Sequence, residues 1–553
     1  TFGVWMQIDE FLQINCRSLV ITLCKTATQI EMGKIQNLKI DDTFTTQLPA
    51  DPIEADHQRQ VKGACFSFVS PTPTNNPTLI QSSAEMAETL GIDNTDSPHF
   101  LNIVSGQKNV EGMRPYAMCY GGHQFGNWAG QLGDGRAINI AEVETKSGNW
   151  FLQLKGAGRT PYSRGADGLA VLRSSIRESL MSEAMFHLGI STTRALSLSL
   201  TGDEVLRDVL YNGNAAYEKG AVVCRTAPSF IRFGNFEIFA SWQDKVNLKG
   251  LADYTIRTNY PHLGEPSKEV YLQFFKEVAV RSRKMVLDWQ RVGFVHGVMN
   301  TDNMSILGLT IDYGPYGWLE NYDPGWTPNT TDAQHKRYRY GNQPSVVLWN
   351  LTQLANAIYP LIEDVPALEA ILDEFKTTYQ SEYETMMLSK LGIFDSQADD
   401  ANFINQLTEN LRRTETDMTL FFRNLTKLNS TAPIDHLALI QTDSYLSPED
   451  FERKAFQWKA WLNEYATRVK SGNNSETNRH AKMNAINPKY VLRNYMAHVA
   501  IESADKGDYS IIDELFQLLK QPYDEQPKNQ KWFTKRPSWA DEKVGCSMLS
   551  CSS

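Results

Sequence analysis

Three side chains between residues 293 and 314 have the types and spacing of a metal-dependent phosphate site. His296 stands seven residues before Asn303, and Asp312 follows the asparagine by nine. Amide and carboxylate oxygens are ligands that Mg²⁺ and Mn²⁺ accept, and such cations bridge nucleotide phosphates and offset their charge. The pattern therefore predicts that Asn303 and Asp312 hold a divalent cation beside a nucleotide.

The same spacing occurs in kinase-like phosphotransferases, with one difference. In those enzymes an Asp two residues after the His accepts the proton of the attacking hydroxyl group. Here that position is Val298, which cannot accept a proton, and the nearest carboxylate is Asp302, beside Asn303. The predicted metal ligands are thus present, while the usual base is missing.

Upstream of this stretch, a glycine-rich turn is followed by a predicted hairpin. The turn, 120–136, precedes strands predicted at 137–143 and 150–154, and the second strand ends on Lys155. Glycine-rich turns are common, but a Lys at the end of the following hairpin strengthens the signal for a nucleotide site. This order of elements is typical of the small lobe of a kinase-like enzyme.

The next predicted helix, 169–188, provides a partner for this lysine. Its apolar residues recur at three- and four-residue steps, which indicates one buried stripe, and it carries Glu178. In a kinase-like site a helix-borne Glu holds the strand lysine on the phosphates. We therefore predict a Lys155–Glu178 ion pair, although Glu178 taken alone reads as a solvated helix carboxylate. Arg225 and Arg232, further along, could fork onto phosphate oxygens.

The second half of the chain is predicted to be mainly helical. A polar stretch, 243–266, is interpreted as the passage between two lobes, and Ser267 caps an amphipathic helix that runs to Gln290. Further helices are predicted over 345–361, 366–391, 401–428, 448–470 and 488–505. The predicted fold class is α+β, a protein-kinase-like two-lobed fold with a small β-rich lobe carrying one key helix and a large helical lobe.

Five segments are expected from these patterns. Residues 1–31 are interpreted as an upstream or non-native segment, because the chain begins with Thr1 and Met32 opens a plausible natural start. The other segments are an N-terminal extension (32–115), the two lobes (116–245 and 246–526) and a polar, flexible tail (527–553).

Composition and charge exclude several classes of protein. Hydrophobic residues make up 41% of the 553 residues, and the formal net charge is −10, which argues against a general nucleic-acid binder. None of the seven cysteines forms a CxxC pair, and no run of eighteen apolar residues occurs. We expect a cytoplasmic protein with no membrane partner, no structural zinc and no disulfide framework.

Long motif runs resemble one family in the right order. The chain contains YGGHQFG, QLGDGRA, LKGAGRTPYSRGADGLAVLRSSIRE, CRTAPSFIRFGNFE, HGVMNTDNMS and LTIDYGP. These runs look like the selenoprotein O family of protein adenylyltransferases, from about Gln60 through Glu502 to the tail. The resemblance implies a kinase-like fold that binds ATP in a reversed orientation and transfers AMP to Ser, Thr or Tyr hydroxyls of proteins, itself included. It also implies Mg²⁺ or Mn²⁺, and UTP as donor in some bacterial members.

The resemblance also assigns roles to individual residues. It implies that Asp302 is the proton acceptor, that Asn303 and Asp312 are metal ligands, and that Asp312 also contacts the nucleotide. The other implied nucleotide contacts are Gly133, Gly135, Arg136, Lys155, Asp167, Gly168, Arg225 and Arg232.

Two alternative functions remain open, and the sequence departs from the family pattern at one position. A true kinase could use Asp302 as its base, and Val298 alone would suggest an inactive nucleotide-binding scaffold. Eukaryotic members carry selenocysteine near the C-terminus, whereas this chain has Cys551 third from its end. Cys546 and Cys551 are candidates for a redox role, with two inert thiols as the alternative.

Overall fold

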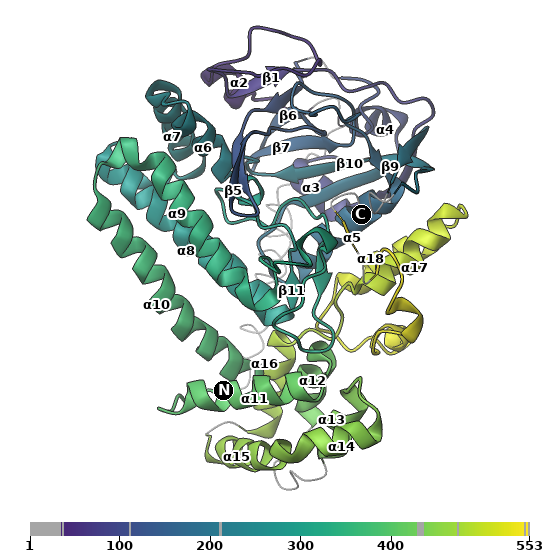
Figure 1. Cartoon of the computed structure of the whole chain (residues 1–553). Coiled ribbons are helices and arrows are strands. Elements are labelled where there is room, and N and C mark those ends of the chain that lie inside the picture. Colours follow the sequence, from purple (N-terminus) through teal and green to yellow (C-terminus); the bar gives the residue numbers. More distant parts are fainter. Residues whose placement is uncertain are drawn as a thin grey trace, which may run out of the picture.

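The computed structural model describes residues 35, 38–109, 112–208, 213–427, 436–472, 475–546 and 549–550. Its sheet lies in the upper part of Figure 1 and most of its helices lie below or beside the sheet. This arrangement confirms the predicted α+β class. The segment interpreted as upstream, 1–31, lies outside the described residues.

An eight-stranded antiparallel sheet forms the upper part. Its strands follow the order β1-β3-β6-β7-β10-β9-β2, and β8 pairs with β10 off this path. The strands are β1 (Phe66–Phe68), β2 (Thr78–Ser82), β3 (Tyr116–Met118), β6 (Ala137–Thr145), β7 (Gly148–Lys155), β8 (Ala170–Val171), β9 (Arg194–Arg207) and β10 (Ala216–Ala227). The predicted hairpin is confirmed, because β6 pairs with β7 from Ala137↔Lys155 to Thr145↔Gly148.

Two further two-stranded pairs lie outside this sheet. One is the hairpin of β4 (Gly121–Gln124) and β5 (Asn127–Gln131), and the other joins β11 (Phe294–Val295) to β12 (Gly317–Trp318). The second pair brackets the stretch that carries Asn303 and Asp312. Asn303 and Asp312 therefore both lie in the segment that connects these two paired strands.

Helix α5 (Leu172–His187) is the predicted helix that carries Glu178. It begins three residues later than expected, because Ala170 and Val171 pair with Ala221 and Gly220 as strand β8. The helix packs against β9 and β10 and also against α17 (Asn494–Asp505) and α18 (Ser510–Leu519). Buried between sheet and helices, α5 holds a fixed position beside the strand that ends on Lys155.

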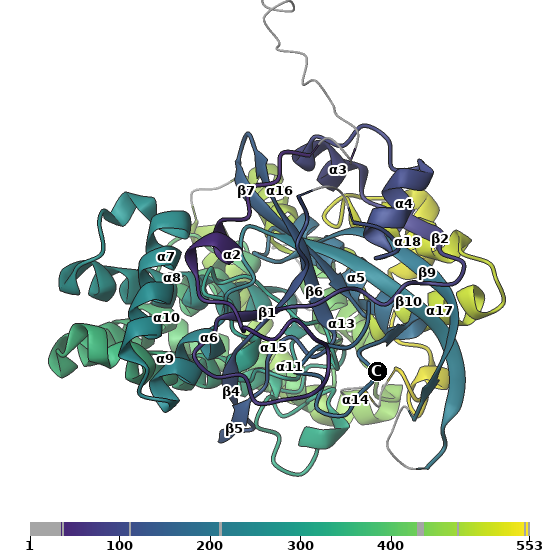
Figure 2. The ribbon, with the colours of Figure 1, turned by 90° about the horizontal axis from the view of Figure 1, so that it is seen from above.

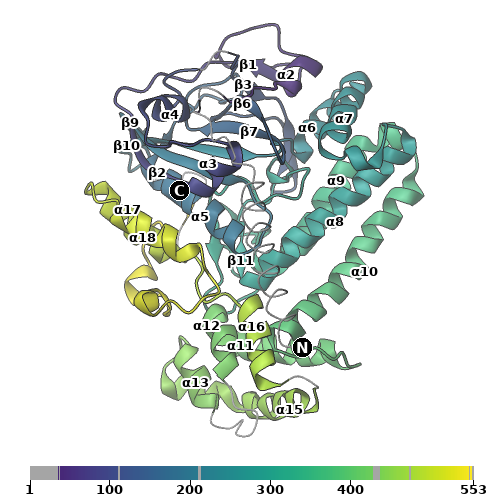
Figure 3. The same ribbon diagram turned by 180° about the vertical axis from the view of Figure 1, so that it is seen from behind.

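The remaining helices lie on both sides of the sheet and below it. Figures 1 and 2 place α7–α10 to one side of the sheet and α17–α18 to the other, while Figure 3 shows α11 and α13–α15 at the end far from the sheet. These helices and the short ones near the N-terminus are α2 (Thr43–Gln47), α3 (Ala84–Leu90), α4 (Pro98–Val104), α6 (Phe233–Ser241), α7 (Lys245–Asn259), α8 (Lys268–Val292), α9 (Gln343–Ile362), α10 (Val365–Lys390), α11 (Asp400–Arg413), α12 (Met418–Asn424), α13 (His436–Asp443), α14 (Pro448–Lys454), α15 (Trp458–Ser471) and α16 (Glu476–Ile486).

The interpretation of 243–266 as a polar passage between lobes is wrong. Most of it is helix α7, whose first turn is capped by the Asp244 side chain accepting from the backbone N–H of Asn247. Leu248, Leu251 and Ile256 are buried at helical spacing, while Lys245, Lys249 and Arg257 are exposed. A narrow apolar stripe among many polar residues is enough to pack a helix on a larger body.

Three of the predicted C-terminal helices differ in extent from the prediction. The predicted helix 401–428 is two helices, α11 and α12, and Asp417 caps the second by accepting from the N–H of Leu420. The predicted helix 448–470 is likewise divided into α14 and α15 by a 3₁₀ turn, and α17 begins at Asn494 rather than at residue 488. Capping residues between two apolar stripes explain the first break, because a capping side chain satisfies the free N–H groups of a new helix.

The described part of the expected flexible tail is packed against the body. It contains two 3₁₀ segments, Pro527–Trp532 and Ser538–Ala540, and Trp532, Ala540 and Cys546 belong to the main hydrophobic core. The backbone N–H of Thr330 donates to the carbonyl of Leu549 at 2.8 Å. The polar composition of this segment concealed a few widely spaced apolar anchors.

Candidate active site

Lys155 and Glu178 form the predicted ion pair. The Lys155 Nζ lies 2.7 Å from Glu178 Oε2 and 3.1 Å from Asp312 Oδ1. Strand β7 supplies the lysine at its last residue, and the middle of α5 supplies the glutamate. Burial lowers the pKa of Lys155, and the carboxylates of Glu178 and Asp312 oppose that effect.

Two buried arginines converge on the same aspartate. Arg225 lies at the end of β10, and its Nη1 is 2.7 Å from Asp312 Oδ1 and 3.0 Å from Glu178 Oε1. Arg232 precedes α6, and its Nη1 is 2.6 Å from Asp312 Oδ2. Burial alone would raise the pKa of Asp312, but Arg225, Lys155 and Arg232 hold it well below its usual range.

Three buried cations share buried carboxylates in this cluster. Lys155, Arg225 and Arg232 are each less than a tenth exposed, and within 3.2 Å they share the carboxylates of Glu178 and Asp312. The buried carboxylate of Asp134 adds a third partner, with its Oδ1 3.9 Å from Arg232 Nη2. Among the described residues the Nη2 atom of Arg232 has no hydrogen-bond partner. Buried cations need anionic partners because desolvation is costly. The arrangement can therefore accept the negative charge of a polyphosphate.

The predicted metal ligands lie on neighbouring backbone segments. Asn303 ends a short 3₁₀ turn, and its Nδ2 donates to the carbonyl of Val298 at 2.9 Å. A cation would therefore bind this side chain through its amide oxygen. Asp312 has a φ of 59°, a left-handed conformation that is uncommon for residues other than glycine. Among the described residues no three His, Cys, Asp or Glu side chains are grouped to hold a metal ion. A cation on Asn303 and Asp312 would thus take further oxygens from phosphate and water, as Mg²⁺ commonly does.

Asp302 lies under the β4–β5 hairpin. The Gln124 Nε2 donates to Asp302 Oδ2 at 3.3 Å, and Arg232 Nη1 donates to the Asp302 carbonyl at 3.0 Å. Within the described chain Asp302 Oδ1 has no hydrogen-bond partner. Burial raises the pKa of Asp302 to about 7, whereas Gln124 and Arg232 act in the opposite direction. A carboxyl with this pKa is a better proton acceptor near neutral pH than an ordinary one.

The glycine-rich turn packs against a tyrosine. A Cβ at Gly133 would lie 2.3 Å from the Tyr162 ring, and one at Gly135 would lie 2.8 Å from the Tyr162 carbonyl oxygen. Arg136 is exposed, but its charge acts on Lys155, which places it at the edge of the cation cluster. The close approach of the two backbones explains why glycine occupies both positions.

Asp167 and Gly168 lie on a separate part of the loop between β7 and α5. Arg207 binds Asp167 through both guanidinium Nη atoms, each at 2.8 Å. Gly168 has a φ of 74°, and a Cβ there would lie 2.0 Å from the Gly158 carbonyl oxygen. In the described structure no hydrogen bond or ion pair joins Asp167 to Lys155, Arg225 or Arg232. The structure therefore does not bring these two residues into the cation cluster.

Known proteins share most of this sequence. A sequence model described as "Protein adenylyltransferase SelO" matches residues 53–520. The chain belongs to the SelO family. It is 60% identical over 523 residues to a protein nucleotidyltransferase, YdiU, of Flavobacterium johnsoniae, across 94% of this chain and 100% of that protein. Proteins of the same name from Aromatoleum aromaticum and Rhodopirellula baltica are 52% and 51% identical over 527 and 541 residues, which is 94% of this chain in both cases and 100% and 99% of those proteins. This SelO-family chain is thus a protein nucleotidyltransferase.

The sequence did not reveal that residues of the β4–β5 hairpin pack against Asp302 and its neighbour Thr301. They belong to the YGGHQFG run, which supported the family resemblance but carried no assigned role. A Cβ at Gly122 would lie 2.8 Å from Asp302 Oδ1, and the N–H of His123 donates to Thr301 Oγ1 at 2.7 Å. Their contacts cross 178 residues of sequence, so no local spacing could reveal them. Two adjacent glycines before a polar pair were the available signal.

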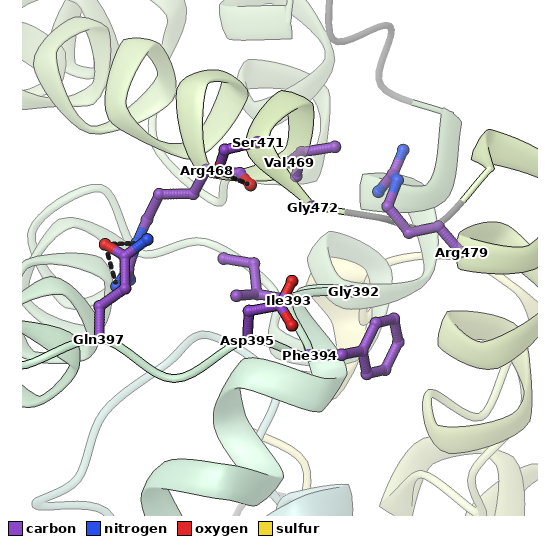
Figure 4. A pocket seen from close by; sticks show the side chains of 10 residues that line it. All are labelled: Gly392, Ile393, Phe394, Asp395, Gln397, Arg468, Val469, Ser471, Gly472 and Arg479. Carbon is purple, nitrogen blue, oxygen red and sulfur yellow. Dashed lines mark hydrogen bonds between the residues drawn. The ribbon is translucent and has the colours of Figure 1, made fainter.

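A small pocket in the helical part is unrelated to this chemistry. It has a volume of about 20 Å³ and lies between the loop after α10 and the ends of α15 and α16. Figure 4 shows Arg468 reaching toward Gln397 while the Arg479 guanidinium points away on the opposite side. A space of this size holds about one water molecule. The two arginines do not converge on it, so it is not an anion site.

The sequence also led to expectations about two cysteines and about membrane-spanning helices. Cys546 is buried, and burial raises the pKa of its thiol to about 12, which disfavours the reactive thiolate in this conformation. Cys551 lies outside the described residues, so the redox role of the two thiols stays a prediction. No helix in the described ranges is both long and apolar enough to cross a bilayer.

Proposed function

We propose that this SelO-family chain transfers AMP from ATP to a Ser, Thr or Tyr hydroxyl of protein substrates, with itself among them. The observation that carries the proposal is the convergence of three buried cations on Asp312, directly beside Asp302. Lysine and arginine side chains gathered at one buried place suit the phosphates of a bound triphosphate. Val298 at the position of the usual kinase base argues against the ordinary presentation of the γ-phosphate.

In this proposal the fold is protein-kinase-like and the nucleotide is reversed. Lys155, Arg225 and Arg232 hold the β- and γ-phosphates, and Glu178 keeps the lysine in place. Gly133, Gly135 and Arg136 line the nucleotide, whose α-phosphorus faces Asp302. Asp167 and Gly168 take part only if the 156–169 loop moves, because Asp167 is held by Arg207.

The transfer step forms one bond and breaks one. The substrate hydroxyl oxygen attacks the α-phosphorus, the bond to the β-phosphate oxygen breaks, and pyrophosphate leaves with the electron pair. Asp302 accepts the hydroxyl proton. A Mg²⁺ or Mn²⁺ ion on Asn303 and Asp312 would supply positive charge to the phosphates. The amide oxygen of Asn303 and the carboxylate of Asp312 are ligands that suit such a hard cation, which leaves the unpartnered Asp302 Oδ1 to accept the proton.

Intact-mass spectrometry tests the transferred group. The chain and a mixture of proteins are incubated with ATP or UTP and with Mg²⁺ or Mn²⁺. The proposal predicts an added mass of roughly 329 Da with ATP, the mass of one AMP unit, on the chain or on a partner. An added mass of roughly 80 Da would instead indicate phosphate transfer and the kinase alternative. A product formed only with UTP and Mn²⁺ would change the donor but not the reaction class.

A further inference from the structure

A group of side chains beside the candidate site has no role in the proposed chemistry. Trp128, at the β4–β5 hairpin, is 40% exposed and its ring centroid lies 5.1 Å from that of His123. The His123 ring lies 5.4 Å from Trp349, and the Arg337 guanidinium lies 4.6 Å over the same Trp349 ring. These four side chains form a continuous row that begins on the hairpin covering Asp302.

A basic segment continues this row. Residues 335–339 read HKRYR, and His335 and Lys336 are exposed while Arg337 and Arg339 are half-buried. Across the described residues no carboxylate lies within ion-pair distance of Lys336, Arg337 or Arg339. In a chain with a net charge of −10, a group of cations beside the candidate site is unexpected from composition. The carboxylate of Asp332 lies nearby, and burial raises its pKa while the charge of Arg337 lowers it. We name His335, Lys336, Arg337 and Arg339 the basic rim.

The basic rim is fixed to the catalytic loop. Asp332 accepts from the backbone N–H groups of Arg337 and Tyr338 at 2.9 and 2.7 Å. The Tyr338 hydroxyl donates to Asn300 Oδ1 at 2.6 Å, and the N–H of Phe125 donates to the same hydroxyl at 2.9 Å. Asn300 stands two residues before Asp302. The rim, the hairpin and the loop of the proton acceptor are therefore held together as one unit.

We propose that Trp128 and the basic rim dock the protein substrate through acidic residues that flank its target hydroxyl. The inference rests on the proposed function for the presence of a protein substrate, and it adds the chemical class that is recognised. Lysine and arginine side chains pair with carboxylates, arginine through two parallel hydrogen bonds. Tryptophan and arginine are both enriched in interface hot spots, and this row contains an exposed Trp128 and Arg337. Charge complementarity at a rim sets the association rate and its salt dependence.

Peptide binding tests this docking directly. Three fluorescein-labelled twelve-residue peptides share a Tyr-Thr-Ser centre and differ only in flanks of Glu, Gln or Lys. Fluorescence anisotropy is measured with α,β-methylene-ATP and Mg²⁺ present, so that an acidic peptide cannot occupy the phosphate cluster. We expect the Glu peptide to bind more tightly than the other two, and to weaken as salt is raised.

Variants locate the binding surface. The double variant Lys336→Glu with Arg337→Glu should weaken binding of the Glu peptide at least about fivefold. Trp128→Ala should weaken it to a similar degree without changing the salt dependence. Lys470→Glu changes another exposed lysine, on α15, and is the charge control; this variant should bind as the unmodified chain does. Thermal unfolding of each variant verifies that it is folded.

Each outcome decides between docking and transfer. Equal binding of the three peptides, or unchanged binding in the double variant, would overturn the docking proposal. Tighter binding of a dT12 oligonucleotide than of the Glu peptide would overturn it in favour of a nucleic-acid partner. The peptides could also bind as predicted while no protein becomes labelled by ATP that carries a label on its α-phosphate. That result would support the docking surface and reject the proposed function. AMP transfer to the Glu and Lys peptides with equal KM would support the proposed function and reject the docking surface.

Discussion

At the residue scale, Asp312 is the point on which the candidate site depends. Three buried cations contact its two carboxylate oxygens at 2.6–3.1 Å. Their combined charge keeps the pKa of Asp312 low, so this carboxylate is ionised throughout the physiological pH range. The same aspartate is the predicted metal ligand, so a cation bound there would be coupled to the three positively charged side chains.

Replacement of Asp312 should remove activity and metal-dependent stabilisation together. Asp312→Ala deletes a metal ligand and leaves three cations with one fewer carboxylate, so we expect at least about a hundredfold loss of transfer activity. The rise in melting temperature caused by ATP with Mg²⁺ should also shrink. Asn303→Ala is expected to act in the same direction but less severely. Near-normal turnover by Asp312→Ala would show that the metal site lies elsewhere.

Some of the residues at the site could be predicted and others could not. Lys155, Glu178 and Asp312 were predictable because each lies at a fixed place on a strand, a helix and a loop whose order is visible in the sequence. Gln124 and Gly122 were not, because their contact with Asp302 depends on how a hairpin folds over a distant loop. The raised pKa of Asp302 also depends on that burial.

At the element scale, the helical part is joined by a buried ion pair. Arg493, just before α17, binds Asp417 at the start of α12 through two hydrogen bonds of 2.6 and 2.9 Å. Both side chains are almost fully buried. Asp417 also caps α12, and it lies in the break that divides the predicted helix 401–428. The spacing of apolar residues in the sequence continues across this break. The reason for the break is therefore visible only in the ion pair between Asp417 and the distant Arg493.

Loss of Arg493 should destabilise the fold strongly. Arg493→Ala leaves the Asp417 charge buried without its partner, which typically costs about 3–5 kcal/mol of unfolding free energy. The matched control is Arg412→Ala, which removes an exposed pair with Glu409 on α11 and should cost at most about 0.5 kcal/mol. Urea denaturation of both variants measures the difference. Equal, small costs would mean that the buried pair contributes no more than the surface one.

Asp443 predicts a pH-dependent stability in the same region. Burial at the end of α13 raises its pKa to about 7, against hydrogen bonds from Asn424 that lower it. Because this folded-state pKa lies above the unfolded value, the folded state binds more protons between pH about 4 and 7, and stability falls as the pH rises through that window. Asp443→Asn should therefore stabilise the protein at pH 8 by roughly 1 kcal/mol or more, and the gain should shrink toward pH 5. A gain independent of pH contradicts this account.

At the scale of the whole molecule, the C-terminal segment packs against the main hydrophobic core. Trp532 and Cys546 enter the main core, and Arg536 Nη1 lies 2.7 Å from Glu320 Oε2. This segment also contacts Thr330, in the region that follows Asp312. The overall division into sheet and helices followed from periodicity and glycine placement. The packing of 527–546 did not, because single apolar anchors in a polar segment have no period.

Two tryptophans of this segment provide a matched test of that packing. Trp532 is 8% exposed and its Nε1 donates to Glu514 at 2.8 Å, whereas Trp539 is 48% exposed. Trp532→Ala should cost about 3–5 kcal/mol of unfolding free energy, and Trp539→Ala less than about 1 kcal/mol. If both replacements have the same small effect, the segment does not form part of the core in solution.

The central claim is that the site transfers the α-phosphorus of ATP to protein. The most direct measurement incubates the chain with Mg²⁺ or Mn²⁺ and ATP labelled at either the α- or the γ-phosphate, followed by a denaturing gel. Adenylyl transfer releases pyrophosphate, so only α-label should become protein-bound, and Asp302→Ala should lose most of it. Protein-bound γ-label that disappears in Asp302→Ala would contradict the account and establish the chain as a kinase.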